Sequence, residues 1–397
     1  MARLLICDPV CAQPFGHNVV ALNYFNNAFK DVFDTSIAFC CKRLPQNLLE
    51  KYGFNGFYDW YYQDYLHLPV EESTCTPVYA HELATYSDPL EVMATRDAEQ
   101  LLKDYSVCRD DVIFFPSVDF YGVVGLLNAL LNYPLDKQPQ LKLRFIGVTE
   151  HSSLSHRDPE RTLIQKLGTA QKVGVRISCG AETPRLADKL AALLATAVDV
   201  IPYPNLAEPV PLPSSGPFRV FCPGSARFDK GFLSLLEIFS QVRHLDPDLN
   251  ICFVAQNLTP RDALHHQNYA SKLYAVPGVE LLEYSITEEE MCARYSECCA
   301  VLLPYDQKTY HYRGSAALME AAYFGRPAIT LAGTAFADQA TYYNLGIVCQ
   351  NLEQMVSAVI KLSRENRSVL EQQASQSRYR FRADIEHSYH RWMGARS

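Results

Sequence analysis

Short apolar runs, each followed by a polar segment, recur along the whole chain. Runs of this kind are typical of parallel strands that are buried on both faces of a sheet. The stretches between them repeat apolar residues every three or four positions, which predicts amphipathic helices. This alternation predicts an α/β protein with doubly wound parallel sheets. The clearest strand runs are residues 3–7, 112–116, 143–151, 218–222, 300–304 and 328–331.

The length of the chain and the position of its prolines predict two domains. A chain of 397 residues can build two domains with separate cores. The stretch 202–217 is rich in proline, which favours a boundary there. We therefore predict an N-terminal domain over residues 1–203 and a second domain over residues 204–377. Residues 378–397 carry aromatic side chains among several arginines, and we expect them to form a C-terminal helix.

The segment that follows the run at 300–304 is suited to hold a nucleoside diphosphate. Gly314 and Ser315 open a predicted helix, and the backbone amides at a helix start point outward with the positive end of the helix dipole. Arg313 adds a cation beside them. Glu320 lies just over one turn further along, where its carboxylate can accept hydrogen bonds from ribose hydroxyls. The alternative is an ordinary strand-helix-strand unit in which Glu320 is a solvated helix residue.

A second loop places two basic residues at the end of another strand. Arg227 and Lys230 follow the strand run 218–222 and precede a helix predicted over residues 232–245. Open α/β sheets bind ligands at this edge, close to helix starts. The order Lys230-Gly231 does not fit a P-loop, and no G-x-G-x-x-G follows the first strand. ATPase and dinucleotide-binding functions are therefore disfavoured.

These two loops, in this order, resemble the C-terminal half of GT-B glycosyltransferases, most closely glycosyltransferase family 4, over about residues 200–375. The resemblance implies a role for each matching residue. Arg227 and Lys230 resemble the basic pair that neutralises the donor diphosphate. Gly314 and Ser315 resemble the phosphate-binding amides. Glu320 matches the second glutamate of the family's E-x7-E motif, which usually binds the nucleotide ribose.

Other positions extend or depart from the resemblance. The register of the first motif glutamate falls on Tyr312, next to the donor sugar. Gly16 lies in a loop that resembles the glycine loop near donor and acceptor in GT-B enzymes. His151 falls where many family 4 enzymes carry a histidine facing the donor sugar, although a histidine after a strand is often only a satisfied polar residue. Asp119 and Glu150 are candidate bases for an inverting reaction.

The resemblance implies two Rossmann-like domains that face a central cleft, with the last helix returning to the first domain. It also implies transfer of a sugar from a nucleotide donor to a glycan, lipid-linked or small-molecule acceptor, with retention of configuration and without a metal or cofactor. His151, Arg227 and Lys230 would be the catalytic residues. Two alternatives stay open: a nucleotide-sugar epimerase with the same fold, and a non-catalytic donor-binding partner of a transferase, which Tyr312 motivates.

Composition and charge limit where the protein is expected to occur in the cell and which partners it can bind. The net charge of −8 disfavours nucleic acid, because binding to phosphates along a strand needs a basic face. The 13 cysteines lack paired metal spacing, which favours free thiols in a reducing cytosol. No apolar stretch resembles a signal peptide or reaches transmembrane length. We expect a cytoplasmic protein, and Arg378, Arg380 and Arg382 offer an alternative of peripheral contact with an anionic membrane.

Overall fold

The computed structural model of the chain describes residues 2–14, 17–58, 88–147, 158–204, 209–224, 226–259 and 266–394. The chain divides into two compact units. Unit 1 comprises Met1–Pro202 together with Ser388–Ser397, and unit 2 comprises Tyr203–His387. The boundary expected after residue 203 lies one residue from this division.

Unit 1 is built on a sheet of seven parallel strands in the order β3-β2-β1-β4-β5-β6-β7. The apolar runs at 3–7 and 112–116 form β1 and β4, as predicted, and the central strands are buried. The strands are β1 Arg3–Asp8, β2 Thr35–Cys41, β3 Asn55–Tyr58, β4 Val112–Phe115, β5 Gln140–Phe145, β6 Arg176–Ala181 and β7 Asp199–Val200.

The strand predicted over residues 143–151 was placed too late in the chain, because β5 begins at Gln140 and ends at Phe145. Two buried charged residues inside β5 hide its apolar pattern. Lys142 donates a hydrogen bond to the carbonyl oxygen of Trp392 at 2.5 Å. Arg144 forms an ion pair with Glu182 at 3.4 Å and donates to backbone carbonyl groups. These partners allow both charges to be buried in the sheet.

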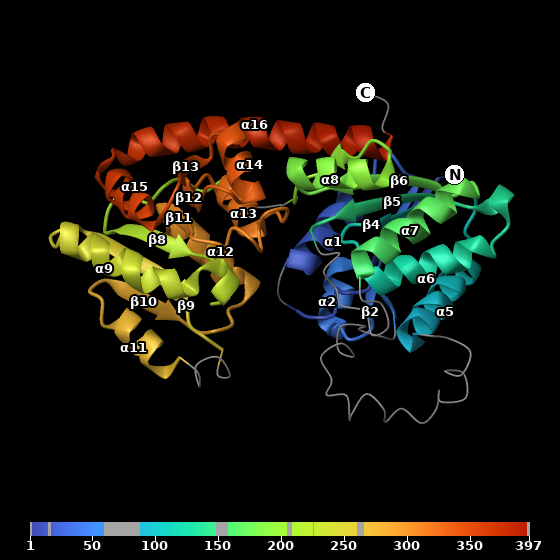
Figure 1. Ribbon diagram of the computed structural model, residues 1–397, viewed down its shortest axis with the longest axis horizontal. Helices are drawn as coiled ribbons and strands as arrows, with labels where there is room; N and C mark the ends of the chain where they lie inside the picture. The colour runs from blue at the N-terminus through green and yellow to red at the C-terminus, as the bar shows by residue number, and fades with distance from the viewer. Residues whose placement is uncertain are drawn as a thin grey trace. The chain divides into compact units, whose positions relative to one another are not determined.

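Helices cover both faces of the unit 1 sheet. Phe114 packs edge-on against Phe25 of α1, with the two ring centroids 4.9 Å apart. The adjacent Ile113 and Phe115 belong instead to the core under α5, α6 and α7. Successive strand residues therefore serve opposite faces. Figure 1 shows α5, α6 and α7 side by side. The helices are α1 His17–Ala28, α2 Gln46–Tyr52, α5 Pro89–Asp104, α6 Phe120–Leu131, α7 Pro159–Lys172 and α8 Pro184–Leu194, with a short 3₁₀ turn at Leu135–Lys137.

Unit 2 repeats the same plan with six parallel strands in the order β10-β9-β8-β11-β12-β13. The chain reverses its direction of growth between β8 and β11, which are neighbours in the sheet. Open sheets of this kind bind ligands at the carboxyl ends of the two strands beside the reversal. The strands are β8 Phe218–Cys222, β9 Ile251–Gln256, β10 Val279–Leu282, β11 Ala300–Leu303, β12 Ala328–Leu331 and β13 Gly346–Cys349.

The helices of unit 2 also lie on two faces. On one face α9 packs against α11 and α15, and on the other α12 packs against α13. The predicted helix over residues 232–245 exists, but it opens with a 3₁₀ turn at Phe232–Ser234 before α9 begins. The helices are α9 Leu235–Leu245, α11 Gln267–Tyr274, α12 Glu288–Glu297, α13 Ala316–Phe324, α14 Ala335–Tyr343 and α15 Leu352–Arg364.

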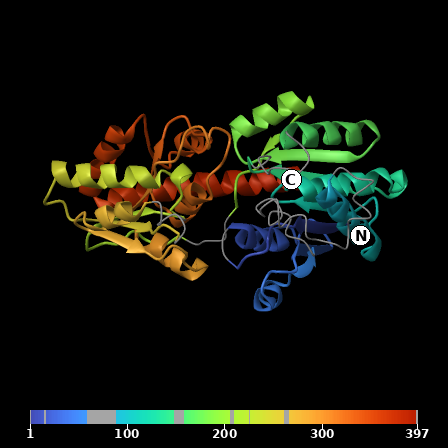
Figure 2. The same cartoon turned by 60° about the horizontal axis from the view of Figure 1, so that its bottom comes forward.

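The last helix, α16, spans Arg367–Met393 and is continuous in both views (Figures 1 and 2). The helix begins well before the predicted residue 378. Its first turns are mostly polar and carry little apolar periodicity, so the sequence pattern does not reveal them. Phe381 packs against Tyr323 and Tyr343 within unit 2. Tyr389 packs against Phe25 within unit 1. None of the helices in the described ranges is long and apolar enough to cross a membrane.

Candidate functional site

The loops after β8 and β11 meet at the carboxyl edge of the unit 2 sheet. Gly231 has a φ of +72°, which favours glycine, and a Cβ atom at this position would overlap the carbonyl oxygen of Pro304. The backbone amide of Asp306 donates a hydrogen bond to the carbonyl oxygen of Asp229 at 2.8 Å. These two contacts hold the loops together at the reversal point of the sheet.

The loop after β8 carries Lys230 close to its own backbone. Gly224 has a φ of +90°, and a Cβ atom there would overlap the Lys230 ammonium group. The ammonium lies 5.9 Å from the centre of the Tyr305 ring. The Lys230 side chain is half-buried, and within the described ranges its ammonium group forms no hydrogen bond or ion pair. It is therefore a cation held in place by packing, which suits an anionic ligand.

The pKa of Lys230 is lowered to about 8, first by burial and then by the charge of Arg227. The carboxylates of Asp229 and Glu320 act in the opposite direction. A like charge and a water-poor surrounding both disfavour an ammonium ion, so a bound anion would relieve both effects.

Arg227 is paired within the protein rather than free. Its Nε donates to Asp229 Oδ1 at 2.9 Å, and a second nitrogen donates to Asp229 Oδ2. That second nitrogen also lies 3.3 Å from the hydroxyl oxygen of Tyr310. Burial alone would raise the pKa of Asp229, but the hydrogen bonds and charge of Arg227 outweigh it and hold the pKa below its usual range. Asp229 and Tyr310 were not among the site residues predicted from the sequence.

The segment predicted to open a helix after β11 does so. Ser315 is the N-cap of α13, and its hydroxyl oxygen accepts a hydrogen bond from the Leu318 amide at 3.2 Å. The helix ends at Phe324 with Gly325 in the left-handed region, and β12 follows, as predicted. The Ser315 side chain satisfies only one amide of the first turn. The positive end of the helix dipole lies at this turn, so its other amides can donate hydrogen bonds to an anion.

Glu320 lies on α13 and faces the same cluster. Burial raises its pKa to about 7, while a hydrogen bond from Tyr295 and the charge of Lys230 lower it. Tyr295 is itself buried and donates to the carbonyl oxygen of Ala317 at 3.2 Å. A carboxyl group in this setting accepts hydrogen bonds strongly when it is ionised. We call Arg227, Asp229, Lys230, Tyr305, Tyr310 and Glu320 the switch-point cluster.

The remaining predicted residues are less tightly tied to this cluster. Tyr312 is 36% exposed, and its ring contacts that of His311 at 4.5 Å. Arg313 is half-buried, and burial lowers the pKa of its guanidinium group. Gly314 joins Arg313 to the α13 cap. Gly16 and His151 lie outside the described residues, so their predicted positions beside a ligand stay predictions.

Unit 1 holds a buried carboxyl group that the sequence analysis did not single out. Asp8, at the end of β1, is 1% exposed and accepts a hydrogen bond from Asn18 Nδ2 at 3.2 Å. Burial raises its pKa to about 7, and the nearby Asp119 adds to this effect. Asp119 is the N-cap of α6 and accepts from the Gly122 amide at 2.9 Å. Glu150, the other candidate base, lies outside the described residues.

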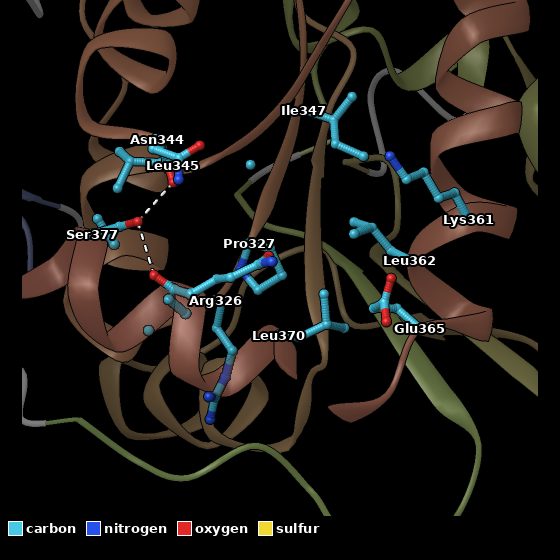
Figure 3. Close-up of a pocket in the computed structure, with 15 residues that line it drawn as sticks. Arg326, Pro327, Asn344, Leu345, Ile347, Lys361, Leu362, Glu365, Leu370 and Ser377 are labelled. Atoms are coloured by element: carbon cyan, nitrogen blue, oxygen red, sulfur yellow. Dashed lines mark hydrogen bonds between the residues drawn. The ribbon is translucent and has the colours of Figure 1, made fainter. Parts of the chain in front are cut away.

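A cavity of about 160 Å³ lies elsewhere in unit 2, between α15 and α16 (Figure 3). Pro327 and Gly346 line it from the amino ends of β12 and β13, so it opens at the edge of the sheet opposite to the switch-point cluster. Ser377 donates to the carbonyl oxygen of Asn344 at 2.7 Å beside it. Arg326 is engaged with backbone carbonyl groups such as that of Tyr295. We assign this cavity no part in the site.

Comparison with known proteins supports the fold. No family model matches the chain, and no curated protein sequence matches it. Anabaena HepE, solved in complex with UDP, is 12% identical over 100% of both chains, with a TM-score of 0.64. The trehalose-6-phosphate synthase OtsA is 11% identical over 98% of this chain and 97% of its own, with a TM-score of 0.63. TarM is 14% identical over 77% of this chain, with a TM-score of 0.55, and this chain covers 58% of TarM.

Identities this low show a shared fold alone. With its two parallel-sheet α/β units, the chain has the fold of GT-B glycosyltransferases, which confirms the predicted fold class. Membership of glycosyltransferase family 4 stays a prediction.

Proposed function

We propose that this chain is a glycosyltransferase that moves a sugar from a nucleoside diphosphate donor to an acceptor hydroxyl. The observation that carries the proposal is the half-buried Lys230 ammonium at the reversal point of the unit 2 sheet. It has no carboxylate bonded to it in the described part of the chain, and it lies beside a second cation, Arg227. The bound UDP of HepE, a protein of the same fold, supports a nucleotide ligand.

The proposed donor lies with its phosphates toward Lys230 and the start of α13. Lys230 and Arg227 supply positive charge, and the backbone at Gly314 and Ser315 supplies amide donors. Glu320 accepts hydrogen bonds from the ribose hydroxyls. The charge of Lys230 lowers the pKa of this carboxyl group, so the two residues lie close enough for one nucleotide to reach both in the proposed complex.

The chemistry proposed is cleavage of the bond between the anomeric carbon and the diphosphate oxygen. The electron pair of that bond leaves with the diphosphate, which gains negative charge. The acceptor oxygen bonds to the anomeric carbon, and its proton passes to the departing diphosphate. Cations and amides already in place lower this barrier, because they need no rearrangement as the charge develops. Metal independence, retention of configuration and a role for His151 at the sugar belong to the proposal on the strength of the resemblance.

Turnover of sugar nucleotides tests the proposal. Wild-type protein is incubated with UDP-sugars, with and without a glycan or lipid-linked acceptor, and release of UDP is measured in the presence and absence of a chelator. Lys230→Met should lower the rate at least about tenfold, because it removes a charge-assisted contact to the leaving group. Lys272→Met, an exposed lysine of α11, is the matched control. A rate that is unchanged in Lys230→Met contradicts the proposal.

A second candidate is a non-catalytic donor-binding partner of a transferase. The observation that favours it is Tyr312, which stands where the resemblance places a carboxylate and is 36% exposed. Binding of UDP without turnover of any UDP-sugar, alone or with a partner transferase, selects this function. Interconversion of UDP-sugars without an acceptor instead selects an epimerase.

A further inference from the structure

Arg227 is the centre of a small polar network that joins the two loops. It presents two nitrogens to the two carboxylate oxygens of Asp229, the paired geometry in which an arginine and a carboxylate bind most strongly. Tyr310 completes the network, because its hydroxyl lies 3.3 Å from both the Arg227 nitrogen and Asp229 Oδ2. The side chain of Arg227 is 49% exposed and that of Asp229 25%, so one side of the guanidinium group still faces solvent.

Tyr310 is itself firmly fixed. It is 5% exposed, and its ring packs against Tyr305 at 4.7 Å and Phe336 at 5.7 Å between centroids. Its amide donates to the carbonyl oxygen of Asp306 at 3.0 Å, and its own carbonyl oxygen accepts from Ala335 at 2.9 Å. A hydroxyl held in this way can restrain the guanidinium group to which it is bonded.

The groups that face Lys230 come from three parts of unit 2. Arg227 and Asp229 lie in its own loop, Glu320 lies on α13, and the ring of Tyr305 faces it from the loop after β11. Arg227 disfavours the Lys230 ammonium, whereas Asp229 and Glu320 favour it. Asp229 therefore offsets the repulsion between two cations that lie side by side.

We propose that Asp229 and Tyr310 are positioning residues, which hold the Arg227 guanidinium beside the Lys230 ammonium so that both cations face one diphosphate. The inference rests on the proposed function. Asp229 and Tyr310 act through Arg227 and Lys230 and need not touch the ligand. Asp229 thus strengthens a site for an anion by fixing Arg227, although its own negative charge repels the anion.

The first test needs no ligand. Trace acetylation of the Lys230 amine is measured by mass spectrometry between about pH 6 and about pH 10, because only the neutral amine reacts. In the wild type the midpoint should lie near pH 8, the lowered pKa of Lys230. In Asp229→Asn it should move to lower pH, since Arg227 is no longer neutralised. Asp246→Asn, which breaks another arginine-aspartate pair of unit 2, should leave the midpoint unchanged.

The second test is calorimetric titration with UDP and with inorganic pyrophosphate above pH 7. In Asp229→Asn the affinity should begin to fall at a lower pH than in the wild type. Tyr310→Phe should weaken UDP binding about threefold to tenfold, the size expected for one hydrogen bond. In an Arg227→Met background the same change should have almost no further effect, because Tyr310 acts through Arg227. Tyr274→Phe, an exposed tyrosine of α11, is the control.

The two tests separate the failure of the inference from the failure of the proposed function. An acetylation midpoint that does not move in Asp229→Asn overturns the inference even where UDP binds tightly. Equal effects of Tyr310→Phe with and without Arg227 also overturn it. Wild-type protein that binds neither UDP nor pyrophosphate contradicts the proposed function and with it the positioning role, while the acetylation result still reports the charge arrangement itself.

Discussion

Gly231 and Pro304 approach each other so closely that a methyl group on Gly231 would overlap the Pro304 carbonyl oxygen. The contact joins the loop after β8 to the loop after β11, although the two residues are far apart in the sequence. It fixes the spacing between Lys230, which precedes Gly231, and the start of α13, which follows the second loop.

Gly231→Ala should therefore separate the two loops. We expect the free energy of unfolding to fall by about 2 kcal/mol or more, because the overlap adds to the strain of a positive φ. Urea unfolding followed by circular dichroism measures this. Gly216→Ala is the matched control, since Gly216 has a φ of +81° but no atom within 4 Å of an added Cβ. Equal losses in both variants would show that the contact with Pro304 does not matter.

Asp8 should make stability depend on pH. The pKa of Asp8 is raised from 3.8 to about 7 by burial, so the folded state binds its proton more tightly than the unfolded state. The stability that this proton provides is present below about pH 4 and is lost as the pH rises through 7. Asp8→Asn should thus raise the free energy of unfolding by about 1 to 4 kcal/mol at pH 8.

The same substitution should have a much smaller effect at pH 5, where wild-type Asp8 is mostly protonated in the folded state. Urea unfolding at both pH values gives the comparison, with the exposed Asp136→Asn as the control. An equal gain at the two pH values would mean that Asp8 is charged throughout this range.

Tyr312→Phe should leave the affinity for UDP nearly unchanged. Tyr312 is 36% exposed and lies outside the switch-point cluster, in the register where the resemblance places a contact to the donor sugar. Its hydroxyl should affect binding or turnover only when the nucleotide carries a sugar. The affinity for UDP and the rate of UDP-sugar turnover are therefore both measured. A large loss of affinity for UDP itself would show that the register is wrong.

Much of unit 2 could be predicted because its local signals agree with one another. The runs at 218–222 and 328–331 coincide with β8 and β12, and Ser315 and Gly325 cap α13 at the two ends. These features depend on residues close together in the sequence, where apolar periodicity and capping preferences act.

The network around Arg227 could not be predicted in the same way. Tyr310 meets Asp229 across 81 positions of sequence, and only the order of strands in the sheet brings β8 beside β11. Nothing in the local sequence distinguishes Asp229 from a solvated loop residue. Lys142 illustrates a related difficulty, because its burial depends on the carbonyl oxygen of Trp392, which lies near the other end of the chain.

Glu320 should discriminate ribose from deoxyribose. Hydrogen bonds from two ribose hydroxyls to a carboxylate shielded from water are charge-assisted, worth about 1.5 to 3 kcal/mol each. Wild-type protein should therefore bind UDP more tightly than 2′-deoxy-UDP. Glu320→Gln should bind UDP more weakly and should narrow this difference while folding normally. Full UDP affinity in Glu320→Gln, with no preference between the two nucleotides in the wild type, would make Glu320 an ordinary helix residue.

The most direct test of the nucleotide site compares UDP with uridine on wild-type protein and Lys230→Met. Isothermal titration calorimetry at about pH 7, below the lowered pKa of Lys230, measures all four affinities. We predict that Lys230→Met weakens UDP binding by about tenfold or more and leaves uridine binding almost unchanged, since the ammonium should contact only the phosphates. Equal losses for UDP and uridine, or no loss for UDP, would contradict it.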